Sequence, residues 1–150
     1  MRAIIQRVSH ASVEIEMQKI SEIGFGLLIF LSVEAADTQD DIVWLAQKIA
    51  NMRIFDDENG VMNLSIIDKK AEMLIVSNFT LHASTKKGNR PTYIRAAGRA
   101  ISLPMYEQFV KYIKETYSLQ VKTGEFGADM QVQLTNSGPV TIIIDSKIKE

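Results

Sequence analysis

The segment "GFGLLIFLSV", Gly24–Val33, is a near-continuous apolar run that begins between two glycines and carries no charge. A strand with one face in water alternates apolar and polar residues, whereas a strand covered on both faces is apolar throughout. The segment therefore predicts a central strand, with other parts of the chain packed on each of its faces.

Two β-rich segments precede this strand, "RAIIQRV" (2–8) and "ASVEIEM" (11–17). In the second, apolar and acidic residues alternate from 13 to 16, which is the period of a half-buried strand. The pair predicts a first hairpin, whose turn "VSHAS" contains His10.

A helix is predicted over 37–52, "DTQDDIVWLAQKIANM". Thr38 followed by Asp41 three residues later resembles a capping box, and apolar residues recur at helical spacing from Ile42 to Ile49. The remaining patterns predict a hairpin (53–66), an apolar strand (72–81), a long basic loop (82–100), a second amphipathic helix (103–117) and two strands (130–145) that turn at "NSGPVT" (136–141).

The Gly138–Pro139 pair stands at the mouth of the apolar segment "PVTIIID". Proline has no N–H to give to a sheet, so it is tolerated at the first residue of a strand and argues against a strand interior. The pair marks either a plain turn or a place where the main chain has a functional task.

The order of elements shows no βαβ rhythm, which favours the α+β class. We expect a mixed or antiparallel sheet curled into a barrel-like core, with two main helices packed on it. The length of 150 residues fits a single domain, 1–150.

Charge is unevenly distributed. The whole chain has 17 basic and 18 acidic residues, yet the segment 73–106 contains no Asp or Glu and carries a cluster of basic residues. One basic segment on an acidic body is typical of a polyanion site such as an RNA site, although a solvated loop paired with the acidic remainder is an equal alternative. The cluster is Lys86, Lys87, Arg90, Arg95 and Arg99.

Several classes of site are not expected. The chain has no cysteine, and its two histidines lack the spacing of metal ligands, so we expect no metal and no cofactor. "GFG" opens a strand and is no dinucleotide fingerprint. The amino-terminal segment holds no signal-peptide apolar region, and no apolar run is long enough to span a membrane, so a cytoplasmic protein is expected.

Catalytic side chains are scarce. A triad needs a base, and only His10 and His82 could serve; no acid lies near His82 in sequence to orient it. What remains is hydroxyls and main chain at the polar breaks "SNFT" and "NSGPVT". Such groups can form an oxyanion hole, although composition alone favours Ser77 and Thr80 as strand-end residues that bond their own neighbours.

The chain resembles the D-aminoacyl-tRNA deacylase family over essentially its whole length. The family signatures Ser-Gln-Phe-Thr-Leu and Asn-x-Gly-Pro-Val-Thr correspond to 77–81 and 136–141. The segments that carry the resemblance are "MRAIIQRVSHASV", "GFGLLIFLSVEAADTQDD", "KIANMRIFDDENGVMNLS", "LIVSNFTLHASTKKGNRP", "GEFGADMQVQL" and "NSGPVT".

The resemblance implies a homodimer with active sites at the subunit interface. Such an enzyme hydrolyses the ester between a D-amino acid, or glycine mischarged on alanine tRNA, and the 3′-terminal adenosine of tRNA. It also implies that a cis Gly138–Pro139 bond reaches into the partner's pocket and excludes L side chains. Carried over by position, Ser77, Phe79 and Thr80 surround the ester, with the Phe79 N–H as oxyanion donor. Lys86, Lys87, Arg90 and Met130 contact the tRNA.

Three residues depart from the family pattern. Asn78 replaces a Gln, which puts any contact by that side chain in doubt. Ser84 replaces an Asp and makes the loop more basic, and Ser137 replaces an Asp before the Gly-Pro pair. A serine can buttress the loop with fewer acceptors than an acid.

Two alternatives stay open. A module that binds RNA without catalysis would keep the basic segment, with Thr80 as a strand cap. A relative with a trans Gly-Pro bond and altered specificity is disfavoured, because it should not keep the Ser-x-Phe-Thr-Leu motif.

Overall fold

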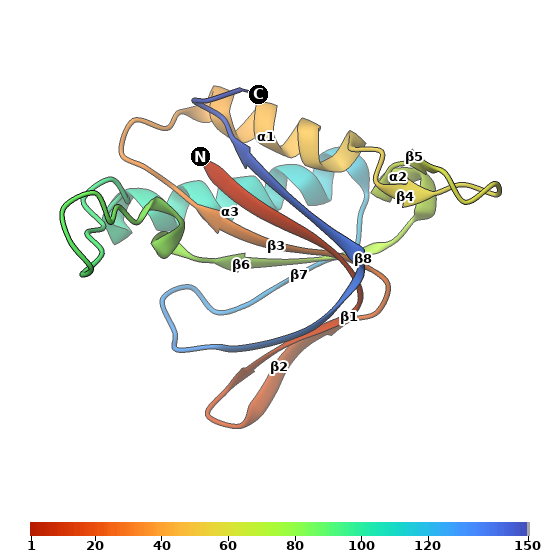
Figure 1. The fold of residues 1–150 in the computed structure, drawn as a ribbon, viewed down its shortest axis with the longest axis horizontal. Helices are drawn as coiled ribbons and strands as arrows, with labels where there is room; N and C mark the ends of the chain where they lie inside the picture. Colours follow the sequence, from red (N-terminus) through yellow and green to blue (C-terminus); the bar gives the residue numbers. More distant parts are fainter. Residues whose placement is uncertain (150) are drawn as a thin grey trace.

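The computed structural model describes residues 1–149, and these residues form an α+β structure with a barrel-like mixed sheet (Figure 1). Two long helices and one short helix accompany the strands. The elements are β1 (Arg2–Ile15), β2 (Gln18–Ile23), β3 (Gly26–Ser32), α1 (Gln39–Asn51), β4 (Phe55–Asp56), β5 (Met62–Leu64), α2 (Ile66–Lys69), β6 (Glu72–Ser77), a 3-10 turn (Phe79–His82), α3 (Arg99–Tyr117), β7 (Val121–Thr123) and β8 (Gln131–Asp145).

Strand β3 is central, as its apolar sequence predicts. It pairs antiparallel with β1 and parallel with β6. Alternate residues of β3 belong to two different buried clusters, since Leu27 and Ile29 pack with the helices while Leu28 packs with the opposite cluster. Gly26 lies so close to the main chain of Glu72 that a Cβ would collide with the Glu72 carbonyl oxygen, which explains why a glycine begins this strand.

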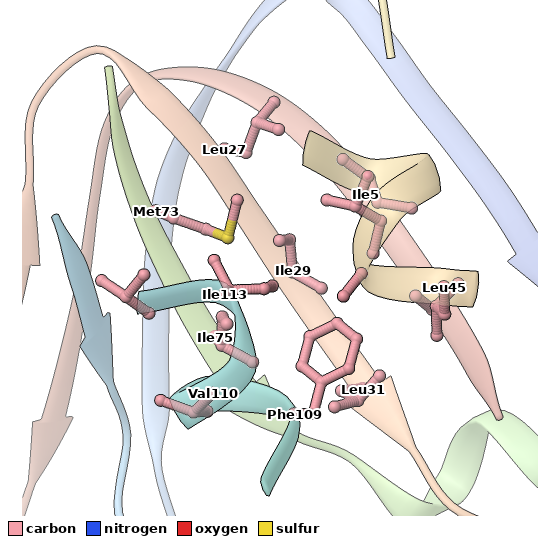
Figure 2. Packing of buried hydrophobic residues seen from close by; sticks show 14 of the residues in the cluster. Ile5, Leu27, Ile29, Leu31, Leu45, Met73, Ile75, Phe109, Val110 and Ile113 are labelled. Atoms are coloured by element: carbon pink, nitrogen blue, oxygen red, sulfur yellow. The ribbon is translucent and has the colours of Figure 1, made fainter. Parts of the chain in front are cut away.

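The larger core lies between the sheet and the two long helices (Figures 1 and 2). Both helices cover the same side of the sheet. Phe109 and Ile113 of α3 and Leu45 of α1 are fully buried against Ile29 and Ile75 of the sheet. The predicted helical face of α1 is therefore confirmed, and the Asp41 carboxylate accepts a hydrogen bond from the Thr38 N–H (2.8 Å), as in a capping box.

The amino-terminal hairpin was placed wrongly by the sequence patterns. Residues 2–15 form one strand, whose first part pairs with β3 and whose later part pairs with β2. The turn falls at Glu16 and Met17, which both have left-handed φ (49° and 63°), as a two-residue hairpin loop requires. His10 is therefore a strand residue opposite Thr135, and it contacts Glu22 (2.7 Å).

The two strands expected over 130–145 are in fact the single strand β8, which pairs antiparallel with β1 over its length. The register explains the proline. Asn136 lies opposite Val8 and Thr141 lies opposite Gln6, so the four residues 137–140 bulge out against Arg7 alone. Bulges are one of the few places where a sheet accepts proline, because the missing N–H has no ladder partner there.

Other boundaries also differ. The strand predicted over 72–81 ends at Ser77, and α3 begins at Arg99 and not near 103, so Pro104 lies inside the helix. The 53–66 hairpin is confirmed as β4 and β5. The short elements β2, β7 and α2 were not predicted.

Candidate active site

An apolar cavity of about 400 Å³ opens where β3 and β6 end. It lies between these strand ends, the start of α3 and the segment that leads into β8. The Tyr106 hydroxyl lies beside the cavity, but its proton is already used in a hydrogen bond to the Ile75 carbonyl (2.7 Å). Burial raises the pKa of this phenol. Among the lining residues are Ser32, Ser77, Phe79, Tyr106, Phe126 and Met130.

The turn after Ser77 is organised by Asn78. Its N–H donates to the Leu31 carbonyl (2.8 Å), and its side-chain oxygen accepts hydrogen bonds from the N–H and the hydroxyl of Thr80. The shorter side chain in place of glutamine thus has a local partner, and it caps the 3-10 turn. Phe79 is 57% exposed and packs edge-on against Tyr93 with ring centroids 5.1 Å apart.

The Phe79 N–H is available to a ligand. Neighbouring amides of the turn are used: Thr80 bonds the Asn78 side chain and Leu81 bonds the Asn78 carbonyl (3.3 Å). Within residues 1–149, no hydrogen bond from the Phe79 N–H is formed. Phe79 itself forms part of the cavity wall.

Thr80 lies on the other side of the turn. Ser77 and Phe79 line the apolar cavity, whereas Thr80 lines a neighbouring groove of about 750 Å³ together with Leu81, Ile4 and Ile143. The three residues expected around one ester are therefore brought together by a single turn, but they are divided between two adjoining surfaces.

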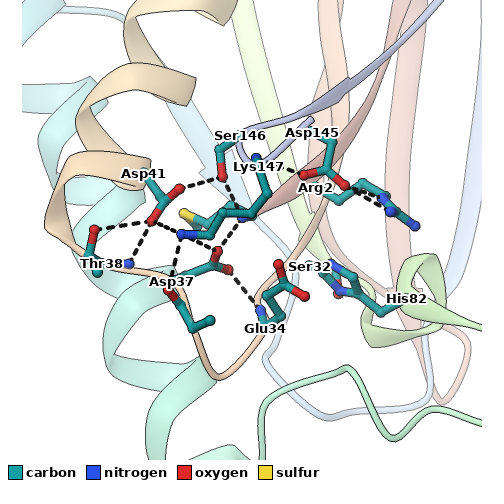
Figure 3. A network of polar contacts seen from close by, with 12 residues as sticks. Arg2, Ser32, Glu34, Asp37, Thr38, Asp41, His82, Asp145, Ser146 and Lys147 are labelled. Atoms are coloured by element: carbon teal, nitrogen blue, oxygen red, sulfur yellow. Dashed lines mark hydrogen bonds and ion pairs between the residues drawn. The ribbon is translucent and has the colours of Figure 1, made fainter. Parts of the chain in front are cut away.

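Arg2 ties this turn to β8, and Figure 3 shows its contact with Asp145 of that strand. Its guanidinium donates to the Leu81 carbonyl (2.7 Å) and to the Asp145 carboxylate (2.8 and 3.0 Å). Burial alone would raise the pKa of Asp145, but hydrogen bonds from the Lys147 N–H and from Arg2 hold it below its usual value. Beyond Asp145, the hydroxyl of Ser146 accepts from the Met1 amine and donates to Asp41, which also pairs with Lys147 (2.7 Å). The end of β8 is thereby fastened to α1.

His82 closes the turn and is buried, with 1% of its surface exposed. Its Nδ1 lies 2.7 Å from the Ser32 hydroxyl, and its Nε2 has no hydrogen-bond partner within the described part of the chain. Burial lowers the pKa of the imidazole, and the nearby Arg2 charge lowers it further. His82 is therefore a neutral structural neighbour of the site and lines neither hollow around the turn.

The Gly138–Pro139 peptide bond is cis, and it forms the tip of the bulge in β8. Asn136 closes the neck of the bulge: its side-chain oxygen accepts from the Val140 N–H (2.9 Å) and its amide donates to the Thr141 hydroxyl (3.0 Å). Gly138 and Pro139 are exposed.

Arg7 supports the bulge from inside. It is 7% exposed, and its guanidinium donates to the Ser137 carbonyl (3.1 Å) and the Ile54 carbonyl (2.8 Å) and pairs with Asp56 (3.3 Å). Within residues 1–149, the Ser137 side chain takes no part in these contacts. The buttress expected from an acid at that position is thus supplied by Asn136 and Arg7.

The bulge and the turn are well separated within one chain. Arg2 binds the Leu81 carbonyl and Arg7 binds the Ser137 carbonyl. The two arginines stand at positions 2 and 7 of the extended strand β1, a separation of roughly 17 Å. A single chain therefore does not bring its own Gly138–Pro139 bulge to its own Thr80.

The basic loop divides into two sets. Arg95 pairs with Glu34 (3.1 Å), and the Arg99 guanidinium lies over the Phe126 ring at 5.4 Å. By contrast, no ion pair within residues 1–149 involves Lys86, Lys87 or Arg90, all three of which are exposed. In the same described range there is no cluster of three metal-ligating side chains, and no helix is long and apolar enough to cross a membrane.

Comparison with known proteins assigns the family. The D-Tyr-tRNA(Tyr) deacylase family profile matches residues 4–145. A D-aminoacyl-tRNA deacylase of Bacteroides fragilis (strain YCH46) is 59% identical over 150 residues, which cover 100% of both chains. The chain belongs to this deacylase family. Another relative of that name, from Thermosipho africanus (strain TCF52B), is 54% identical over 98% of each chain.

Two solved structures share the fold of this chain. The protein described as c-Myc DNA Unwinding Element Binding Protein superposes with a TM-score of 0.93 at 39% identity, over 97% of this chain and 98% of that one. A probable eukaryotic D-amino acid tRNA deacylase shares the fold, with a TM-score of 0.84 at 14% identity over 95% and 97% of the two chains. The resemblance seen in the sequence is confirmed, and the family is one of hydrolases that act on aminoacyl-tRNA esters. A module without catalysis is not supported.

Two residues of this candidate site were missed by the sequence patterns, although both left a signal. In β1 the residues on the face of Ala3 and Ile5 are buried, and Arg7 is the next residue on that face, so a buried cation was foreseeable. Ser32 is a single hydroxyl at the end of the apolar run of β3. A polar residue in a doubly covered strand needs a buried partner, and here the partner is His82.

Proposed function

We propose that the chain hydrolyses the ester between a D-amino acid and the 3′-terminal adenosine of tRNA, and that it spares L-aminoacyl-tRNA. The observation that carries this proposal is the unused Phe79 N–H in a capped turn at the mouth of an apolar cavity. Membership of the deacylase family supplies the substrate class. The adenosine would occupy the cavity beside Ser77 and Met130, and the compartment would be the cytoplasm.

The chemistry needs no basic side chain. An aminoacyl ester is already activated, so a positioned water and a donor for the developing oxyanion can suffice. The Phe79 N–H would be that donor, and the Thr80 hydroxyl would position the water or relay a proton. Thr80 bonds the amide oxygen of Asn78, which is too weak a base to activate a hydroxyl, so we assign no nucleophilic role to Thr80. The neighbouring ribose hydroxyl of the substrate can share the proton transfer.

Rejection of L substrates would come from a second copy of the chain. A wall at Thr80 would come from outside the chain, because Arg2, which binds the turn, and Arg7, which binds the bulge, stand roughly 17 Å apart along β1. A two-fold dimer places the same patch of each subunit against the other, so each Gly138–Pro139 bulge can meet the partner's turn. The carbonyls of these residues would occupy the space that an L side chain requires.

The groove beside Thr80 supports such a dimer. Ile143 pairs with Ile4 in the sheet and is nevertheless 68% exposed, and Ile148 near it is 55% exposed. A row of apolar side chains on the outer face of a sheet is typical of a protein interface. The groove joins this row directly to Thr80 and Leu81.

Steric exclusion has a consequence for glycine. A wall that excludes L side chains cannot reject an amino acid without a side chain. The proposed site would therefore also hydrolyse glycine mischarged on alanine tRNA.

The acceptor stem would lie along the basic loop. Lys86, Lys87 and Arg90 have no ion pair within residues 1–149 and are the basic residues of this segment that are free for phosphates. Phosphate contacts position a nucleic acid without reading its sequence.

The decisive experiment compares D-Tyr-tRNA with L-Tyr-tRNA as substrates under identical conditions, with Gly-tRNA(Ala) as a third. We expect loss of the D-tyrosyl and glycyl esters and survival of the L-tyrosyl ester. Thr80→Ala should slow the reaction without changing the fold. Equal hydrolysis of D and L substrates, or of neither, would contradict the proposal.

A further inference from the structure

His82 is a buried titratable side chain at the proposed site to which the mechanism above assigns no task. We propose that His82 and Ser32 form a neutral positioning pair that holds Phe79 in place through its carbonyl, so that the Phe79 N–H can serve as oxyanion donor. This inference rests on the proposed function. His82 would act on the reacting atoms only through other groups, which makes it a positioning residue.

The contacts place Ser32 between His82 and Phe79. The Ser32 hydroxyl lies 2.7 Å from Nδ1 of His82 and 3.5 Å from the Phe79 carbonyl oxygen. Ser32 ends β3 and lines the cavity, whereas His82 ends the turn that begins at Asn78. The pair thus connects the central strand to the far end of the turn that carries the Phe79 N–H.

The tautomer of His82 follows from its Nε2 atom, which has no hydrogen-bond partner within residues 1–149. A hydroxyl has one proton, so Ser32 can donate either to His82 or to the Phe79 carbonyl. If Ser32 donated to Nδ1, the buried Nε2 would carry an N–H without an acceptor; if Nδ1 donates, Nε2 is a bare acceptor. Orphaned buried donors are rarer than orphaned acceptors, so His82 donates to Ser32 and Ser32 donates to the Phe79 carbonyl.

The charges around His82 keep it neutral. Burial and the cations Arg2, Arg95 and the Met1 amine oppose protonation, whereas Glu34 favours it. Arg95 pairs with Glu34, which weakens that opposing influence. A neutral ring donates from Nδ1 without bringing a charge next to the oxyanion site.

The turn is then fixed at both ends, by Asn78 at its start and by His82 at its close. Phe79 lies between these two anchors, with its carbonyl toward Ser32. An oxyanion donor is effective when its dipole is fixed in advance, because no reorganisation is then needed during the reaction. Loosening the pair should therefore lower kcat and leave KM and tRNA affinity unchanged.

Two substitutions at His82 separate positioning from packing. His82→Asn keeps an N–H donor but loses the ring, and His82→Phe keeps the ring shape but loses the donor. Single-turnover deacylation of D-Tyr-tRNA should fall roughly tenfold in His82→Phe, the effect of one lost hydrogen bond, and less than about threefold in His82→Asn. Ser32→Ala should match His82→Phe, and the double variant should be no slower than either, because the two residues act as a unit.

The outcomes are distinct from those of the D-Tyr-tRNA and L-Tyr-tRNA comparison. Inactivity of the unsubstituted protein on D-Tyr-tRNA would refute the proposed function itself. If that protein is active, the reverse ranking at His82, additive losses in the double variant, or a fall in tRNA affinity in place of kcat would each overturn the positioning role. Circular dichroism and thermal unfolding verify folding. If a His82 variant does not fold, Ser32→Ala, which deletes a single oxygen, tests the pair in its place: an unchanged rate in folded Ser32→Ala would overturn the positioning role.

Discussion

Arg7 is the side chain on which the shape of the Gly138–Pro139 bulge depends most directly. It is almost fully buried and donates to two carbonyls, of Ser137 and Ile54, from one guanidinium. Its planar fork reaches partners in two directions, which a lysine ammonium on a flexible stem cannot reproduce.

Arg7→Ala should destabilise the protein by about 2–4 kcal/mol, because it leaves buried carbonyls without donors and creates a cavity. Urea denaturation measures the change in unfolding free energy. Arg7→Lys keeps the charge and serves as the control, and it should recover only part of the loss. A change below about 0.5 kcal/mol in Arg7→Ala would show that the bulge is held without Arg7.

His82 should make the fold sensitive to acid. Its pKa in the folded protein is below the ordinary value of 6.5, so below about pH 6.5 the unfolded chain binds a proton that the folded chain refuses. The contribution of His82 is complete above this pH and is lost as the pH falls. Between pH 7.5 and 5.5 the unfolding free energy should drop more in the unsubstituted protein than in His82→Phe, because only the unsubstituted chain takes up this proton on unfolding. Urea denaturation at both pH values tests this, and parallel pH profiles would contradict it.

At the scale of elements, the bulge in β8 makes part of a paired strand protrude from the sheet, with Gly138 and Pro139 exposed at its tip. The strand continues on both sides of residues 137–140, and Asn136 closes the neck. Both flanks are paired with β1, so the tip is held by the sheet on each side.

Gly138→Ala should damage this surface. Gly138 has φ +131°, and a Cβ there would lie 2.7 Å from Val140 Cγ2 and 2.9 Å from the Val140 nitrogen. We expect at least about 1 kcal/mol of destabilisation and a smaller ratio of D to L hydrolysis. Gly60→Ala is a matched control, since Gly60 also has positive φ (+74°) but nothing within 4 Å of its Cβ. An unchanged D to L ratio in folded Gly138→Ala would argue against the wall.

The basic loop is the second element with a testable task. Reversal of charge at Lys86 and Lys87 should weaken the binding of all tRNAs to a similar extent, because phosphates are alike in every tRNA. Binding titrations with two different tRNAs at two salt concentrations provide the measurement. The same change at Lys69 and Lys70, an exposed adjacent pair at the end of α2, controls for net charge. Selective loss of one tRNA would mean that the loop reads bases.

At the scale of the whole molecule, the separation of the bulge from Thr80 makes the proposed site a property of two chains. Ile143→Asp should place a charge in the apolar row beside Thr80, and should yield monomers that fold but no longer distinguish or hydrolyse D-aminoacyl-tRNA. Light scattering after gel filtration gives the mass. Met17→Asp, at a turn residue that is 96% exposed, is the control. An active Ile143→Asp monomer would exclude a site shared between subunits.

Several elements of this fold, such as β3, α1 and the β4–β5 hairpin, could be predicted from the sequence, because periodicity depends on residues that are close in the chain. The apolar run of β3 predicted a strand buried on both faces, and the spacing from Ile42 to Ile49 predicted α1. The family signatures at 77–81 and 136–141 likewise point to the deacylase family from short stretches of sequence alone.

Only the tertiary structure decided what happens at the proline and at the turn. Whether residues 136–141 turn or bulge depends on the register of β8 against β1, and the support from Arg7 comes from a residue 130 positions away in the chain. The division of Thr80 from Phe79, and the pairing of His82 with Ser32 across 50 positions, arise in the same way. Local patterns determine elements because backbone preferences act over a few residues, whereas hydrogen-bond partners of buried polar groups are chosen by packing between distant segments.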